Sequence, residues 1–381
     1  MRGVARRHSG TAAQMAHGLF RATVPLCLCA ALSSCKGPAP DAARERVYVP
    51  RGASLTAVTD SLRAHHVVTS PAWFRTYARL RGLSQALKPG LYQFRRGERW
   101  RTIIAMLRSG RTHDLAFTVP EGLTIREIAD LAAARLRLAR DTAPADIRDS
   151  FLAAARDPAL RAEFGIAAPR AVLEPLEGYL LPETYHVVFD SRPRDVVRQM
   201  LRHASLAWDS TADRQAQAIG LSRQEVLTLA SIVEAEARVH AERRRIAGVY
   251  FNRLQRRMPL QADPTVIYSL GRRVTRVLFR HLETRSPYNT YRVSGLPPGP
   301  INNPGVASIQ AALAPEPHAF VFFVARPDGR HMFSVTLRQH ADSIRVSRAL
   351  WSAWQARQDS IQRATRDSLR RAAAAAPAPV P

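Results

Sequence analysis

Two carboxyl side chains near the end of one predicted helix are the best candidates for acid–base chemistry. Ser222 and Glu225 fit a capping box, and apolar residues at helical spacing follow them. Glu234 projects into the apolar stripe of this helix, whereas Glu236 lies at its shoulder. A carboxyl among apolar neighbours stays protonated nearer neutral pH, because burial disfavours its charged form. Such a group can protonate the leaving oxygen of a glycoside.

Spacing alone leaves the roles of these two acids open. Glu234 and Glu236 are separated by two positions, so they do not face each other and do not form a ready-made carboxylate pair. A buried Glu paired with one of the many Arg residues is the structural alternative. Geometry favours Glu234 only slightly over Glu236.

The loops around this helix are rich in Gly and Pro, which is typical of rigid turns. Their Tyr, Asn, Gln and Thr residues offer flat faces and neutral hydrogen-bonding groups, as a sugar-binding groove requires. These segments are residues 176–185, 249–254, 260–268, 286–291 and 294–305. A purely structural role as a loop also explains the composition of any one of them.

Together these segments resemble the YceG-like family of endolytic murein transglycosylases, over nearly everything from Val47 to His340. The resemblance implies an α+β fold, in which a small LysM-like domain at 45–112 precedes a larger α+β catalytic domain at 113–340. It also implies that Glu234 is the catalytic acid. The most specific matches are residues 230–234, 252–254, 261–265, 288–291 and 295–298.

The chain departs from the family pattern in three places. Ala235-Glu236-Ala237 stands where Lys, Glu and Thr usually follow the catalytic Glu, and Leu180-Leu181 stands where an aromatic residue is common. The N-terminus carries a lipobox-like run where family members typically keep one transmembrane helix. None of these departures removes a matching carboxylate.

The expected substrate is the glycan strand of peptidoglycan. Glu234 would protonate the oxygen between N-acetylmuramic acid and N-acetylglucosamine, and hydrolysis would then need a second carboxylate. In a lytic transglycosylase, as the resemblance implies, the C6 hydroxyl of the substrate attacks and leaves a 1,6-anhydro end. One residue that acts first as acid and then as base is sufficient for this reaction.

Six further residues are candidates for substrate contacts. Four of them are expected in the groove: Gln261, Asp263, Tyr288 and Asn289. Asn252 either orients the sugar or caps and packs a helix. Glu183 is either a second carboxylate or part of a loop salt bridge.

The composition limits the other functions. The net charge of +25 on 381 residues favours anionic partners, but no zinc-finger spacing or RNA-reading aromatic motif accompanies it, so we expect no nucleic-acid binding. The three cysteines all lie before residue 36, which leaves none for a metal site in the body of the chain. No other metal-ligating residues accompany His331 or His340, so we expect both to be structural or surface residues. We expect no metal and no cofactor.

The first 35 residues have the pattern of an export signal. Basic residues precede an apolar stretch from Ala22 to Leu32, which is too short to span a bilayer comfortably. The run Leu32-Ser33-Ser34-Cys35 resembles a bacterial lipobox, in which Cys35 is lipidated; an uncleaved anchor or ordinary cleavage is the alternative. Either reading places the protein in the cell envelope, tethered to a membrane with the catalytic domain on the periplasmic side.

The remaining segments complete the predicted organisation. Residues 36–44 are a linker, 45–112 follow a strand–helix–helix–strand–helix order that suits a glycan-binding module or a spacer, and Ile125–Leu136 is a helix. Residues 341–372 form an amphipathic helix, and 373–381 are a disordered tail. Peptidoglycan synthases are possible partners, since the resemblance implies a role in ending nascent strands. The competing hypotheses are a non-enzymatic peptidoglycan-binding lipoprotein and a true hydrolase.

Overall fold

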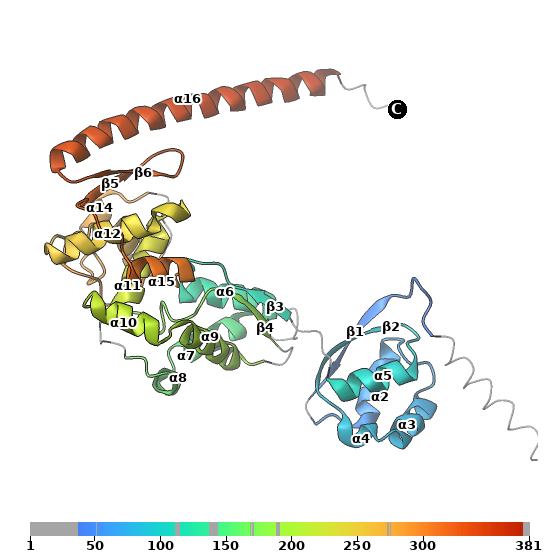
Figure 1. The fold of residues 1–381 in the computed structure, drawn as a ribbon. Helices are drawn as coiled ribbons and strands as arrows, with labels where there is room; N and C mark the ends of the chain where they lie inside the picture. The colour runs from blue at the N-terminus through green and yellow to red at the C-terminus, as the bar shows by residue number, and fades with distance from the viewer. Residues whose placement is uncertain are drawn as a thin grey trace, which may run out of the picture. The chain divides into compact units, whose positions relative to one another are not determined.

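The computed structural model describes residues 37–50, 52–110, 115–136, 144–167, 169, 171–187, 191–272, 274 and 276–375. It combines helices with three small two-stranded sheets, which confirms the predicted α+β class. The chain divides into two compact units (Figure 1), one formed by Met1–Leu115 and His186–Asp190 and the other by Ala116–Tyr185 and Ser191–Pro381. Cys35 and the predicted export signal lie outside the described residues.

The first unit packs helices against a two-stranded antiparallel sheet. Val47 of one strand lies opposite Tyr92 of the other, and both side chains are fully buried. Ser54 begins the first helix by accepting a hydrogen bond from the backbone N–H of Ala57 at 3.1 Å. The predicted element order is confirmed, with one additional short helix. The elements are β1 (Arg44–Val49), α2 (Leu55–Ala64), α3 (Pro71–Leu80), α4 (Leu83–Ala86), β2 (Gly90–Arg95) and α5 (Trp100–Ser109).

The second unit is mainly helical. The predicted helix Ile125–Leu136 is present with the same bounds. Strands β3 (Leu115–Thr118) and β4 (Thr184–Val187) belong to this unit in part, because Leu115, His186 and Val187 fall in the first unit. Its other elements are α6 (Ile125–Leu136), α7 (Pro144–Ala155), α8 (Pro158–Glu163), α9 (Pro193–Ala207), α10 (Ser210–Ala218), α11 (Arg223–Glu236), the 3-10 turn η2 (His240–Glu242), α12 (Arg243–Gln255), α13 (Asp263–Ser269), α14 (Phe279–Leu282), α15 (Val306–Leu313), β5 (Phe322–Ala325), β6 (His331–Ser334) and α16 (Leu337–Ala375).

Helix α11 is the centre of this unit. Its predicted capping box is present, because Ser222 and Glu225 bond to each other's backbone N–H groups. The sequence predicts one apolar stripe, but every residue from Val226 to Val233 is buried. Helices α10, α12, α13 and α15 all pack against α11, so even the polar Thr228 and Ser231 are enclosed.

Helix α16 packs beside a hairpin made by β5 and β6 (Figure 1). Phe323 pairs with Phe333 across this antiparallel hairpin, and Ser347 of α16 donates a hydrogen bond to the carbonyl of Ala325 at 2.7 Å. The helix extends beyond both ends of the predicted range 341–372. Residues 376–381 lie outside the described part of the chain.

Candidate active site

The Glu234 carboxyl is enclosed near the C-terminal end of α11, and both of its oxygens have partners. Its side chain is 8% exposed. Oε1 lies 3.3 Å from Nη2 of Arg243 at the start of α12, and Oε2 accepts a hydrogen bond from the backbone N–H of Gly305 at 3.1 Å. Gly305 is the N-cap of α15, where the helix dipole favours an anion. The carboxyl is thus fixed in place between two helix termini.

These surroundings differ from the apolar environment expected from the helix stripe. The 3-10 turn η2 leads the chain back into α12, which brings Arg243 against the end of α11. Arg243 lies nine residues after Glu234 and on a different helix, so the helical periodicity of α11 does not indicate the contact. The structure therefore contains the buried Glu–Arg pair that spacing alone could not exclude.

A second carboxylate lies at the same guanidinium. Glu121, in the turn between β3 and α6, places Oε2 3.7 Å from Nη2 of Arg243. It packs against Gly305, where an added Cβ would overlap its carboxylate. The sequence pattern does not single out Glu121. The available signal was a Pro-Glu-Gly turn placed directly before a predicted helix.

Glu236, the rival acid on α11, has a different environment. Its Oε1 accepts a hydrogen bond from the hydroxyl of Tyr250 at 3.1 Å. Burial raises the pKa of Glu236 to about 7, the Tyr250 hydrogen bond lowers it, and the charge of Asp263 raises it further. Glu234 and Glu236 therefore have different environments. Glu234 lies against the guanidinium of Arg243, and Glu236 lies against the hydroxyl of Tyr250.

A cavity of about 770 Å³ lies near Glu234, although Glu234 itself is not among the residues that line it. Two neighbours of Glu234 line it: Ala235, the next residue in sequence, and Gly122, where an added Cβ would lie 3.6 Å from Cγ of Glu234. Arg126, Arg148 and Tyr268 line the same cavity. This space can hold part of a polar ligand next to the enclosed carboxyl.

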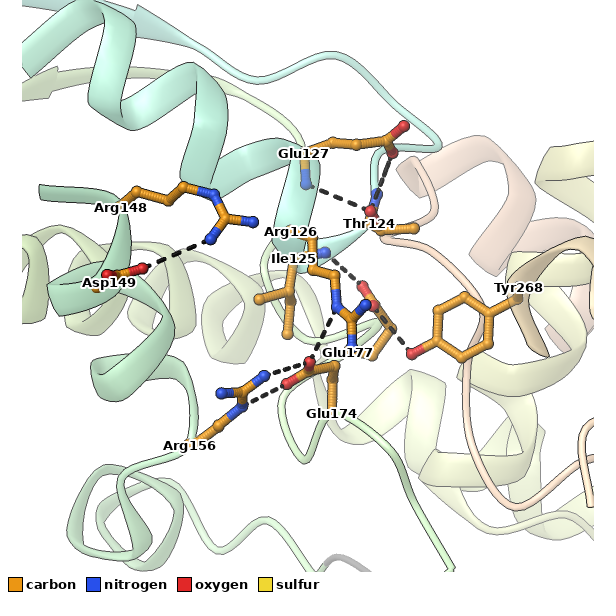
Figure 2. A network of polar contacts seen from close by, with 10 residues as sticks. All are labelled: Thr124, Ile125, Arg126, Glu127, Arg148, Asp149, Arg156, Glu174, Glu177 and Tyr268. Carbon is orange, nitrogen blue, oxygen red and sulfur yellow. Dashed lines mark hydrogen bonds and ion pairs between the residues drawn. The ribbon is translucent and has the colours of Figure 1, made fainter. Parts of the chain in front are cut away.

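Two buried acids, Glu174 and Glu177, line this cavity, and Figure 2 shows their polar contacts. Glu174 receives two hydrogen bonds from Arg156, at 2.7 and 2.9 Å, and a longer one from Arg126 at 3.4 Å. Glu177 accepts hydrogen bonds from the backbone N–H of Ile125 at 3.0 Å and from the hydroxyl of Tyr268 at 3.2 Å. These contacts connect the loop at 174–180 to α6 and α13.

Burial also raises the pKa of Glu177, to about 8, although hydrogen bonds from Ile125, Tyr268 and Asn303 lower it. The folded state therefore binds more protons than the unfolded chain between about pH 4.5 and 8, so stability falls as the pH rises through this window. Replacing Glu177 by Gln keeps an acceptor for Ile125 and removes the titration. We expect the free energy of unfolding of Glu177→Gln to change less steeply with pH, by up to about 1.4 kcal/mol per pH unit.

Urea titrations of wild type and Glu177→Gln at about pH 5, 7 and 9 measure this difference. The variant should gain stability relative to wild type toward pH 9. Glu236 titrates in the same direction, so part of the slope remains in the variant. Parallel stability curves for the two proteins would contradict the assignment.

Two of the predicted groove residues are accessible. Asp263 is exposed and accepts a hydrogen bond from the hydroxyl of Tyr291 at 2.7 Å. Gln261 is also exposed, and its Oε1 accepts from Arg253 at 3.2 Å. Gln261 has a φ of 51°, a left-handed conformation that costs energy for a residue with a Cβ. Backbone strain of this kind is often kept at functional sites.

Two others are fully buried. The Asn289 amide donates to the backbone carbonyls of Leu282 and Thr284, so it holds its own loop together. Tyr288 packs its ring 5.0 Å from that of Tyr268. Tyr288 therefore supports Tyr268, which lines the cavity, whereas Asn289 stabilises its own loop; neither side chain is open to solvent.

Asn252 and Glu183 make the contacts expected if their roles are structural: packing for Asn252 and a loop salt bridge for Glu183. Asn252 donates to the backbone carbonyls of His318 and Phe320, at 2.7 and 2.9 Å. Glu183 is half-exposed, and its carboxylate lies 2.7 Å from Nδ1 of His203. The structure brings neither of them to the Glu234 carboxyl.

The described residues contain no group of three or more His, Cys, Asp or Glu side chains placed to hold a metal ion. Within the same ranges, no helix is both long and apolar enough to cross a bilayer. The groups around Glu234 are the Glu121 carboxylate, the buried guanidinium of Arg243 and the backbone N–H of Gly305.

A model of the YceG-like family matches residues 47–346. The chain belongs to the YceG-like family. This YceG-like chain is 34% identical over 301 residues to the endolytic murein transglycosylase of Bacillus subtilis (strain 168), a match that covers 77% of the chain and 82% of the relative. It is 28% identical to the endolytic murein transglycosylase of Streptococcus pneumoniae (strain R6), with 73% of the chain matched but only 54% of that longer relative.

A crystal structure of a YceG-like protein from Listeria monocytogenes has a similar fold. The TM-score is 0.55 at 30% sequence identity, and the match covers 79% of this chain and 99% of the Listeria chain. The family match ends at residue 346, within α16, so the remainder of that helix lies beyond it.

Proposed function

We propose that this chain is an endolytic murein transglycosylase, a lyase that cuts the bond between N-acetylmuramic acid and N-acetylglucosamine inside peptidoglycan strands. The observation that carries the proposal is the enclosed Glu234 carboxyl, held by Arg243 and Gly305, whose neighbours Gly122 and Ala235 line a cavity of about 770 Å³. The activity named for the Bacillus and Streptococcus relatives supports it.

In the proposed mechanism, protonated Glu234 gives its proton to the glycosidic oxygen. The bond from C1 to that oxygen breaks with its electron pair going to the oxygen, and an oxocarbenium-like centre develops at C1. The C6 hydroxyl of the same muramic acid attacks C1, and ionised Glu234 accepts its proton. The product end is a 1,6-anhydro sugar, and no water is consumed.

We propose that Gln261 and Asp263 contact the glycan, because both are exposed and Gln261 is held in a strained conformation. Tyr288 and Asn289 would act behind the groove, by shaping the loop at 286–291. Asn252 and Glu183 support local structure through the contacts described above.

We also propose that the first unit is a LysM-like glycan-binding module. Its support is the order β1-α2-α3-α4-β2-α5, which places helices between two paired strands. A spacer is the alternative. If a chain without residues 45–112 bound sacculi as tightly as the full chain, the spacer hypothesis would be favoured.

Membrane tethering through Cys35, a location in the cell envelope and a role with peptidoglycan synthases in ending nascent strands complete the proposal. The lipobox-like run at 32–35 supports the tether. Replacing Cys35 by Ser should move the protein out of the membrane fraction; an unchanged fractionation would favour an uncleaved anchor.

Digestion of purified sacculi by the wild-type protein tests the proposed function. We expect soluble fragments longer than disaccharides, because cutting is internal, and their muramic ends should be anhydro ends detected by mass spectrometry. Binding without soluble products would support the non-enzymatic lipoprotein instead. Reducing ends would support a hydrolase.

A further inference from the structure

Arg243 is shared between two carboxylates that come from distant parts of the chain. Its Nη2 lies 3.3 Å from Oε1 of Glu234 and 3.7 Å from Oε2 of Glu121. Both oxygens lie within those distances of one nitrogen, so they are at most about 7 Å apart, a separation over which paired carboxylates act in glycosidases. The Glu234 side chain is 8% exposed and that of Glu121 44%, so one acid is enclosed while the other reaches solvent.

The guanidinium itself is buried, with 7% of its side chain exposed. Its Nε donates to the hydroxyl of Ser308 at 2.9 Å, and its Nη1 is buried without a partner among the described residues. A buried cation that loses its counter-ion is strongly destabilised. Arg243 therefore needs a negative charge beside it in the folded protein.

Glu234 supplies that charge during only part of the proposed reaction. Before it protonates the glycosidic oxygen it is neutral, and after it accepts the C6 proton it is neutral again. Between these two steps it is a carboxylate, which Arg243 and the N–H of Gly305 stabilise. In the neutral stages the carboxylate nearest to Arg243 is Glu121.

Gly305 makes this arrangement possible. Its N–H bonds to Glu234 on one side, and its Cα leaves the space that the Glu121 carboxylate fills. Any Cβ at this position would overlap Glu121. The glycine therefore allows both acids to pack against one backbone unit and to reach one guanidinium.

We propose that Glu121 and Arg243 are positioning residues for Glu234: Glu121 is the counter-ion of Arg243 while Glu234 is protonated, and Arg243 pairs with Glu234 while it is ionised. This inference rests on the proposed function. It assigns no contact between Glu121 and the glycan. The sequence predicts a single acid that acts alone. In this proposal Glu121 balances the charge of Arg243 while Glu234 is neutral.

The test is Glu121→Gln, which removes the charge and keeps the size of the side chain. Without that charge, Arg243 holds Glu234 more strongly in its ionised form. We expect kcat for release of anhydro ends to fall at least tenfold with KM little changed, and the limb on which activity falls with rising pH to move to lower pH. Glu163→Gln is the matched control, because Glu163 is similarly exposed (41%) and also pairs with an arginine, Arg198.

Gly305→Ala provides a second route to the same effect. Its methyl group would displace the Glu121 carboxylate, which is the flexible and exposed end of its side chain, so the fold should tolerate the change. We expect the same loss of kcat and the same shift of the pH profile. A wild-type pH profile and kcat in folded Glu121→Gln would overturn the inference while leaving the proposed function intact. Absence of anhydro ends from the wild-type digest would overturn the proposed function itself.

Discussion

Replacing Glu234 by Gln should reduce the release of anhydro ends from sacculi by about 10²–10⁴-fold, the usual contribution of general acid–base catalysis. The amide is nearly the same size as the carboxyl, and its oxygen can still accept the hydrogen bond from Gly305. It cannot give a proton to the glycosidic oxygen or accept one from the C6 hydroxyl. The variant should therefore fold normally and bind glycan without cutting it.

Glu236→Gln is the matched control, because it lies on the same helix and its pKa of about 7 makes it the rival acid. Its hydrogen-bond partner is Tyr250, on α12. We expect the Glu236 variant to keep activity within about tenfold of wild type. Rates of anhydro-end release and thermal melts of both variants decide between the acids. The reverse order of losses would make Glu236 the catalytic residue.

Replacing Asn303 by Ala should destabilise the second unit by about 3 kcal/mol or more. This fully buried side chain makes four hydrogen bonds. Its Oδ1 accepts from the backbone N–H groups of Gly178 and Leu180, and its Nδ2 donates to the carbonyl of Leu123 and to Glu177. Alanine leaves all four buried groups without this partner, and each such loss costs about 1–3 kcal/mol before relaxation.

The neighbouring Asn302 is the control for this prediction. It is 4% exposed, but its Nδ2 makes one bond, to the carbonyl of Ser231, and its Oδ1 has no partner among the described residues. We expect Asn302→Ala to lose less than half as much stability in urea unfolding. Equal losses would show that burial, and not the four-bond network of Asn303, determines the cost.

Local features of the fold were predictable because they depend on near neighbours in sequence. The capping box at Ser222, the helix Ile125–Leu136 and the strand–helix order of the first unit all follow from spacing and turn residues. The hairpin of β5 and β6 was not predicted, since its strands are only four residues each. Short strands carry too little periodic signal to separate them from loops.

The charged part of the site was not predictable in the same way. Glu121 and Arg243 meet Glu234 only after three separate segments pack together, and a chain rich in Arg offers no pattern that selects one of them. The polar loop at 286–291 shows the converse. Asn289 looks like a ligand-binding residue in sequence, but its amide satisfies backbone carbonyls that the buried loop would otherwise leave unpaired.

Digestion of sacculi in water labelled with ¹⁸O tests the central claim most directly. If the C6 hydroxyl attacks C1, no oxygen from solvent enters the new ends, and the muramic products should be anhydro sugars without ¹⁸O. A hydrolase would place one ¹⁸O atom at each new reducing end. Unlabelled anhydro ends that disappear with Glu234→Gln are the predicted result. Labelled reducing ends, or unlabelled anhydro ends released at the wild-type rate by Glu234→Gln, would contradict the account.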